Sequence, residues 1–126
     1  MSEKRKLTIK NSKGKNIELI VELSESFFKH IKGLMFRNSL ADDEGMLFVF
    51  PDEKPRSLWM LFTKIPLEAL FFGGDGKLLE IISMEPCTGL FCPTYPSKTK
   101  AKYVLEVGKG FSKKNSIEIT KSKLAL

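Results

Sequence analysis

The chain has 126 residues, of which 42% are apolar and 29% are charged, and it carries a net charge of +6. This length fits a single domain, residues 1–126, and the composition excludes wholesale disorder. No run reaches the roughly 18 uncharged apolar residues of a membrane-spanning helix, and residues 1–15 lack the apolar core of a signal peptide, so we expect a cytoplasmic protein without membrane contact.

The first part of the chain predicts a basic β-hairpin followed by a helix. Leu7 and Ile9 alternate with polar residues, a turn is expected around Gly14, and residues 17–23 alternate between apolar and polar side chains. Residues 27–35 then place apolar side chains at helical spacing. We therefore expect two antiparallel strands and one short helix.

The middle of the chain is its most apolar part. Residues 46–50, 58–62 and 67–72 are nearly continuous apolar runs of strand length, typical of strands covered on both faces. Residues 73–76 (Gly-Gly-Asp-Gly) predict a tight hairpin turn, after which residues 77–84 return as a strand. The side chains expected to be buried here are Phe48, Phe50, Phe71 and Ile81.

The last third combines a long loop with short elements. Residues 85–99 hold three of the six prolines and both cysteines, which indicates an irregular loop. The further expectations are a strand at 102–107, a tight turn at 111–115, a short strand around Ile117 and Ile119, and frayed ends at 1–4 and 121–126. The whole pattern predicts a mostly β protein (α+β by count), an antiparallel β-sandwich or distorted barrel of about eight short strands with one short helix.

Cys87 and Cys92 are the two cysteines, separated by four residues. A thioredoxin-like pair has two intervening residues, and a structural zinc site needs four ligands, to which His30 adds one more at most. A disulfide is favoured over free thiols if the source is thermophilic, because intracellular disulfides occur in such organisms. The absence of Gln and the abundance of Lys and Glu favour that source, with codon bias as the alternative.

Four residues are candidates for ligand binding: Arg37, Trp59, Met60 and Glu68. Strand alternation puts Trp59 on one face with Ser57, and Met60 on the other, so Trp59 is either a core side chain or the floor of a pocket. Glu68 interrupts an apolar run, where a carboxylate must be paired or lie at a wet edge. Arg37 is its natural partner, with Arg56 and Lys64 as alternatives. The pair would either fasten the helix end to the sheet or form a small polar site.

No standard catalytic or metal-binding constellation can be assembled from these residues, and no cofactor is expected. We predict a binding module with an aromatic and polar pocket for a small molecule or an extended peptide segment. One alternative is an enzyme that uses Glu68 and Arg37 with a loop carboxylate. The other is nucleic-acid binding through the basic hairpin, which is an unlikely partnership because acidic residues are interleaved with the lysines.

A series of short motifs resembles one known family. In order they are Gly33-Leu34-Met35-Phe36-Arg37, residues 45–50, Trp59-Met60, Ile65-Pro66-Leu67-Glu68, residues 84–87, residues 92–95 and residues 101–107. Over residues 33–111 they resemble the domain of unknown function 192, also called uncharacterised protein family 0127. The resemblance implies a mostly β fold and no particular activity. Family members usually carry a basic residue and Asn where this chain has Leu61-Phe62, and an acid, more often Asp, at Glu68.

Overall fold

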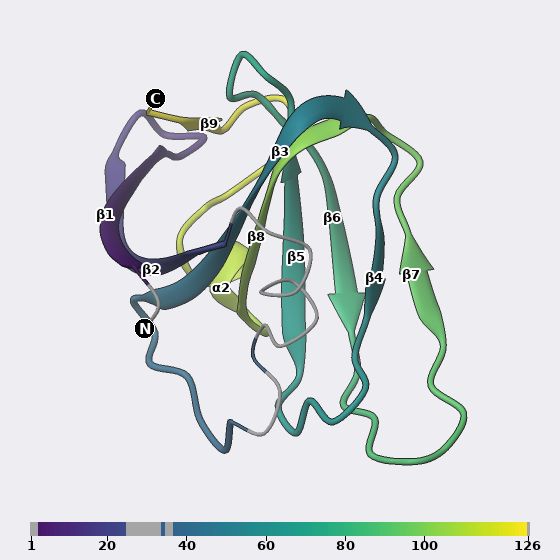
Figure 1. The fold of residues 1–126 in the computed structure, drawn as a ribbon. Coiled ribbons are helices and arrows are strands. Elements are labelled where there is room, and N and C mark those ends of the chain that lie inside the picture. Colours follow the sequence, from purple (N-terminus) through teal and green to yellow (C-terminus); the bar gives the residue numbers. More distant parts are fainter. Residues whose placement is uncertain (1–2, 25–33, 35–36, 126) are drawn as a thin grey trace.

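The computed structural model describes residues 3–24, 34 and 37–125, and its main feature is one curled β-sheet (Figure 1). The strands of this sheet are β1 (Glu3–Lys10), β2 (Asn16–Ser24), β3 (Glu44–Lys54), β5 (Leu67–Phe72), β6 (Leu78–Met84), β8 (Ala101–Gly108) and β9 (Lys123–Leu124). Across the sheet they follow the order β6-β5-β8-β3-β2-β1-β9.

Antiparallel pairing dominates this sheet. The pair β2–β3 is parallel, and every other neighbouring pair is antiparallel. A parallel pair needs a crossover connection of a dozen or more residues, and residues 25–43 supply that length here. The helix expected over residues 27–35 lies outside the described residues except for Leu34, which is buried.

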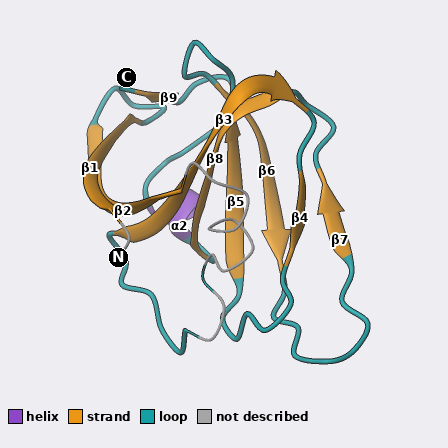
Figure 2. Cartoon of the chain, viewed as in Figure 1, coloured by secondary structure: helices purple, strands orange, loops and turns teal. Residues whose placement is uncertain are grey.

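A second, two-stranded sheet consists of β4 (Ser57–Trp59) and β7 (Thr94–Pro96). Figure 1 shows this small sheet beside β6, on the side of the molecule opposite to the β1–β2 hairpin. The helix α2 (Phe111–Lys114) is the one helix drawn among the described residues, as the colouring of Figure 2 shows. The prediction of a mostly β, distorted barrel is confirmed.

Apolar side chains cover both faces of the central strands. On β5, Leu67, Ala69 and Phe71 belong to one core cluster, and Leu70 and Phe72 belong to the other. The first cluster includes Met46, Phe48, Met60, Met84, Ala101 and Val104, and the second includes Ile9, Leu19, Val21, Leu105, Val107, Phe111 and Leu124. Burial on both faces explains why this part of the sequence has continuous apolar runs.

Several local expectations need correction. Phe48 and Phe71 are buried as expected, whereas Phe50 and Ile81 are only half-buried. The run 58–62 does not continue as a strand beyond Trp59, because the backbone turns there: the Thr63 N–H donates to the Met60 carbonyl (2.9 Å). Phe62 occupies the left-handed region of this turn, with φ of 57°.

The two ends of the chain are more ordered than expected. β1 already begins at Glu3, and β9 pairs with β1 through Ile9 and Leu124. Leu124 is 2% exposed, so the tail contributes to the core instead of fraying. The strand expected around Ile117 and Ile119 does not form, although Ile117 is buried, and the turn expected at 111–115 contains α2.

Candidate functional site

Glu68 lies on β5 and fastens α2 to the sheet. Its carboxylate accepts hydrogen bonds from the Gly110 N–H (3.0 Å), the Ser112 N–H (3.0 Å) and the Ser112 hydroxyl (2.8 Å). Gly110 is the N-cap of α2, so Glu68 supplies the acceptor that a capping side chain normally gives to the free N–H groups of a first turn. The residue is 8% exposed, and its carboxylate is engaged by three donors.

Arg37, the expected partner of Glu68, pairs with a different acid. Its guanidinium forms an ion pair with the carboxylate of Glu22 on β2. The expected Arg37–Glu68 pair is therefore wrong, because a distant segment, residues 110–112, satisfies Glu68. An enzyme built on this pair loses its geometric basis, since the two side chains have separate partners.

Trp59 and Met60 lie in opposite environments although they are neighbours in the chain. Met60 is 1% exposed and packs in the core cluster with Met46 and Phe48, whereas Trp59 is 51% exposed. Glu68 lies on the other face of the large sheet, next to α2. The structure therefore does not bring Trp59 and Glu68 together in one pocket, and it makes Trp59 a surface residue.

The two most exposed large apolar side chains of the described chain lie in the loop that leads to β7, the partner strand of β4, and a third exposed one lies in the turn after β4. Leu90 is 93% exposed, Phe91 is 95% exposed and Phe62 is 41% exposed. We call Trp59, Phe62, Leu90 and Phe91 the apolar rim. Large apolar side chains that are almost fully exposed are unusual on a globular protein and mark surfaces that meet something apolar.

Backbone pairing holds the two segments of the apolar rim together. Trp59 is opposite Thr94 in the β4–β7 sheet, and Thr63 forms an isolated bridge with Cys87. The Cys87 N–H donates to the Thr63 carbonyl (3.2 Å). The loop after β6 and the turn after β4 are thereby joined at their bases.

A disulfide closes the loop that carries the two most exposed residues. Cys87 and Cys92 are bonded, with their Cα atoms 5.8 Å apart, and they enclose Leu90 and Phe91. The disulfide prediction agrees with this structure. The sequence interpretation did not single out Phe62, Leu90 or Phe91, although one signal was available: residues 57–63 and 86–97 contain no charged side chain in a chain that is 29% charged.

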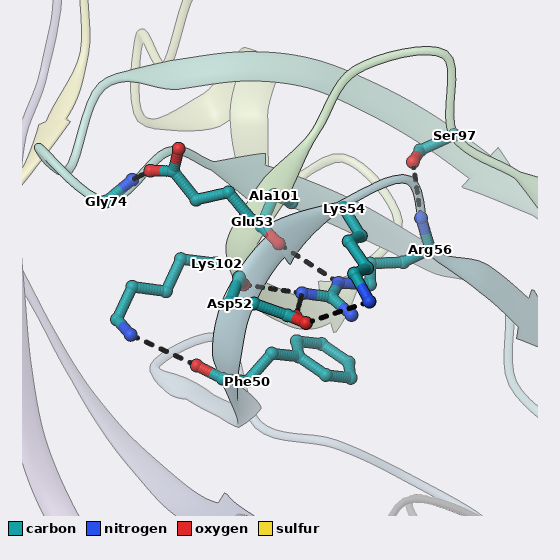
Figure 3. Close-up of polar contacts among 9 residues, drawn as sticks. All are labelled: Phe50, Asp52, Glu53, Lys54, Arg56, Gly74, Ser97, Ala101 and Lys102. Carbon is teal, nitrogen blue, oxygen red and sulfur yellow. Dashed lines mark hydrogen bonds and ion pairs between the residues drawn. The ribbon is translucent and has the colours of Figure 1, made fainter.

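Arg56 organises a polar cluster that supports the small sheet (Figure 3). Its guanidinium donates to the Ala101 carbonyl (3.0 Å) and to the Asp52 carboxylate (2.7 Å), and lies 3.9 Å from the centre of the Phe50 ring. Its backbone N–H donates to the Ser97 hydroxyl (2.8 Å). These contacts tie the end of β3 to β8 and to the residue after β7, so Arg56 is a structural residue beneath β4.

Glu106 is a buried acid on β8 that the sequence did not single out. It is 6% exposed and lies in register between Met46 on β3 and Ala69 on β5. Burial raises the pKa of Glu106 to about 7. No hydrogen bond to its carboxylate occurs within residues 3–24, 34 and 37–125, so its neighbours there do not offset the loss of solvation.

A cavity of about 250 Å³ lies beside α2. Its walls are Leu40, Ala41, Asp42, Gly108, Lys109, Gly110, Phe111 and Lys114. An ion pair between Lys114 and Asp42 (2.7 Å) spans this region, and the Lys114 ammonium group lowers the pKa of Asp42. None of the four predicted ligand-binding residues lines the cavity.

The described residues contain no group of three or more His, Cys, Asp or Glu side chains that could hold a metal ion.

The basic β1–β2 hairpin contains ion pairs. The basic residues of the β1–β2 hairpin include Lys6, which pairs with Glu18 (3.3 Å), and Arg5, which pairs with Glu3 (2.8 Å). Figure 1 places this hairpin on the side of the molecule opposite to the small sheet.

Among the described residues, no helix is both long enough and apolar enough to cross a bilayer.

Comparison with known proteins identifies relatives along nearly the whole chain. Residues 8–122 match the model of the family DUF192, described as "Uncharacterized ACR". A UPF0127 protein from Pyrococcus furiosus is 27% identical over 110 residues, which cover 86% of this chain and 88% of the relative.

Two crystal structures share the fold. A proposed transcription regulator from Sinorhizobium meliloti 1021 superposes with a TM-score of 0.90 at 30% identity, covering 98% of this chain and 94% of that one. A protein of unknown function from Novosphingobium aromaticivorans superposes with a TM-score of 0.85 at 27% identity, covering 98% and 85%.

Proposed function

The chain belongs to the DUF192 family, and we propose that it is a binding module that recognises an apolar partner through the apolar rim. The observation that carries this proposal is the exposure of Leu90 and Phe91, which are 93% and 95% accessible to solvent. Each apolar side chain gains about 2 kcal/mol when it leaves water, so two adjacent ones at a loop tip favour burial against a partner.

The framework beneath the apolar rim supports the same proposal. The Cys87–Cys92 disulfide restricts the loop, and the Arg56 cluster fixes the small sheet that carries Trp59. A binding surface that is ordered in advance loses less conformational entropy on association. This proposal moves the binding region from a pocket between Trp59 and Glu68 to the surface formed by the small sheet and its loops.

Nucleic-acid binding is the second candidate function, because one structural relative is a proposed transcription regulator. The net charge of +6 is compatible with it. The arrangement of charges and aromatic side chains in the described residues favours nucleic-acid binding less than it favours binding of an apolar partner. Arg5 and Lys6 of the first hairpin pair with Glu3 and Glu18, and the small sheet that carries the exposed Trp59 lies on the opposite side of the molecule.

Photocrosslinking tests the binding-module proposal even though the partner is unidentified. Phe91 is replaced by p-benzoylphenylalanine in the full chain, expressed in its own host and irradiated. The matched control carries the same group at Ile119, which is 46% exposed and lies outside the apolar rim. We expect adducts from position 91 that the control lacks, and equal labelling at both positions would overturn the proposal.

A further inference from the structure

We infer that the partner of the apolar rim is the surface of an anionic lipid membrane, into which Leu90 and Phe91 insert. This inference rests on the proposed binding function and names its partner. The expectation of no membrane contact depended on the lack of a spanning helix. A peripheral protein needs no such helix, because inserted apolar side chains and attraction to anionic lipids together give reversible binding at the headgroup boundary.

The small area of the apolar rim argues against a stable protein–protein interface. Fully exposed aromatic side chains bury 150–250 Å² each, so the accessible parts of the four rim residues sum to about 500 Å². A standard protein interface buries about 800 Å² on each partner. A membrane does not need a large complementary face, since apolar side chains gain free energy on leaving water one by one.

The shape of the rim favours a deformable partner. Leu90 and Phe91 are more than nine-tenths exposed, which means that the described part of the chain forms no wall around them. A protein partner would have to provide a matching pocket for this projecting tip. Lipids rearrange around an inserted side chain, so no preformed complement is required.

Charge is distributed as shallow insertion requires. Residues 57–63 and 86–97 carry no charge, so no ionised group has to enter the membrane with the tip. Four charged residues flank these runs. Arg56 pairs with Asp52 (2.7 Å) and Glu85 pairs with Lys109 (3.4 Å), whereas Lys64 and Lys98 form no ion pair among the described residues. The positive charges of Lys64 and Lys98 next to the uncharged runs complement anionic headgroups.

The backbone of the loop limits how deep the tip can go. Among the described residues, the N–H groups of Leu90 and Phe91 have no protein acceptor, and such groups cannot leave water without a large cost. Insertion is therefore restricted to the side chains, at the depth where headgroups and water still meet the backbone. Trp59, half exposed at the base of the loop, lies where interfacial tryptophans are favoured.

Trp59 provides the measurement, because it is the single tryptophan of the chain. The oxidised full-length protein is titrated with vesicles of phosphatidylcholine alone, and with vesicles that also contain phosphatidylglycerol. We expect a blue shift of Trp59 emission and co-sedimentation with the anionic vesicles. Brominated lipids should quench the emission most strongly when the bromine is close to the headgroup.

Three variants test the contributions separately. The double variant L90S/F91S should bind anionic vesicles about a thousandfold more weakly, because two inserting side chains are removed. Lys64→Gln should bind about fivefold more weakly. The control I20S/I119S changes two other exposed apolar residues, 42% and 46% exposed, and should bind like the wild type.

Absence of a blue shift with anionic vesicles, or equal binding of L90S/F91S and the wild type, would overturn the lipid inference. The photocrosslinking at position 91 then separates the two proposals. Adducts to proteins alone would leave the binding module standing with a different partner. Equal labelling at position 91 and at Ile119 would overturn both.

Discussion

At the scale of single residues, Phe62 shows how the backbone explains a family preference. Its φ of 57° places it third in the turn from Met60 to Thr63, where a type II turn requires positive φ. Asn tolerates this conformation better than other non-glycine residues. The Asn that the family resemblance implies at this position would suit the turn for this conformational reason.

The strain at Phe62 can be measured by comparing two truncations. Phe62→Gly should be more stable than Phe62→Ala by about 1 kcal/mol, because Gly adopts positive φ without the steric cost of a Cβ atom. The two variants lose the same aromatic ring, so its packing cancels. Chemical denaturation measures the difference.

The control for this comparison is Phe91, which does not have a positive φ. There the order should reverse, with Phe91→Ala at least as stable as Phe91→Gly, since Gly has more conformational entropy to lose. If Phe62→Ala were as stable as Phe62→Gly, the turn would be relaxed in solution.

Glu106 is the second residue whose environment has a measurable consequence. Its pKa is about 7 in the folded chain and 4.5 ordinarily, so between these pH values the folded state binds more protons than the unfolded state. The free energy of unfolding therefore decreases as pH rises from about 4.5 to 7, by about 3 kcal/mol from this group, and then levels off. Burial is the cause, because it penalises the carboxylate form.

Glu106→Gln should remove this dependence and stabilise the protein at pH 8. The control is Glu118→Gln, an exposed acid, which should keep the dependence of the wild type. Urea denaturation at pH 5, 6, 7 and 8 measures both variants. A Glu106→Gln protein that is less stable than the wild type at pH 8 would contradict the prediction and indicate a favourable partner for the carboxylate.

At the scale of elements, the loop after β6 depends on its disulfide. Cys87 and Cys92 join the end of β6 to the start of β7, and the Cys87 N–H bonds to the turn after β4. The four residues between the cysteines are too few to bury their own apolar side chains. The loop therefore keeps its shape through the covalent link and the backbone pairing at its base.

Removal of the disulfide should lower the stability modestly. The double variant C87A/C92A should lose about 2 kcal/mol in free energy of unfolding, the value expected for closing so short a loop. Addition of a reductant to the wild type should produce a similar loss and no change in the double variant. Rapid alkylation of both thiols in the folded, unreduced protein would show that the bond is absent.

At the scale of the whole molecule, charge and apolar surface lie apart. The basic β1–β2 hairpin and the small sheet are on opposite sides of the molecule (Figure 1). Nucleic-acid binding through the hairpin and ligand binding near Trp59 thus concern different faces. The separation makes them independently testable.

Binding to nucleic acid should be weak and should disappear as salt increases. The described cations of the hairpin are partly neutralised by Glu3 and Glu18, and stacking aromatic side chains are not beside them. Fluorescence anisotropy with labelled single-stranded and double-stranded DNA measures this over a range of salt concentrations. Sub-micromolar affinity that persists at physiological salt would contradict the prediction and favour the first hairpin as the functional surface.

The sequence by itself determined the elements whose pattern is local. The alternation in residues 17–23 predicted β2, the run 67–72 predicted a strand covered on both faces, and residues 73–76 predicted a tight turn. These features depend on the alternation of side chains along a strand and on the conformational freedom of glycine. Both are properties of residues that are adjacent in the sequence, so no contact with a distant segment is needed to predict them.

Only the tertiary structure decided which residues meet. Glu68 bonds to Ser112 and Gly110 instead of Arg37, and β9 completes the sheet edge although its two residues carry little strand signal. Leu90 and Phe91 are as apolar as the core residues, and their exposure follows from the closed loop that projects them. The physical reason is that burial, pairing and exposure depend on contacts between segments far apart in the chain, which local periodicity does not encode.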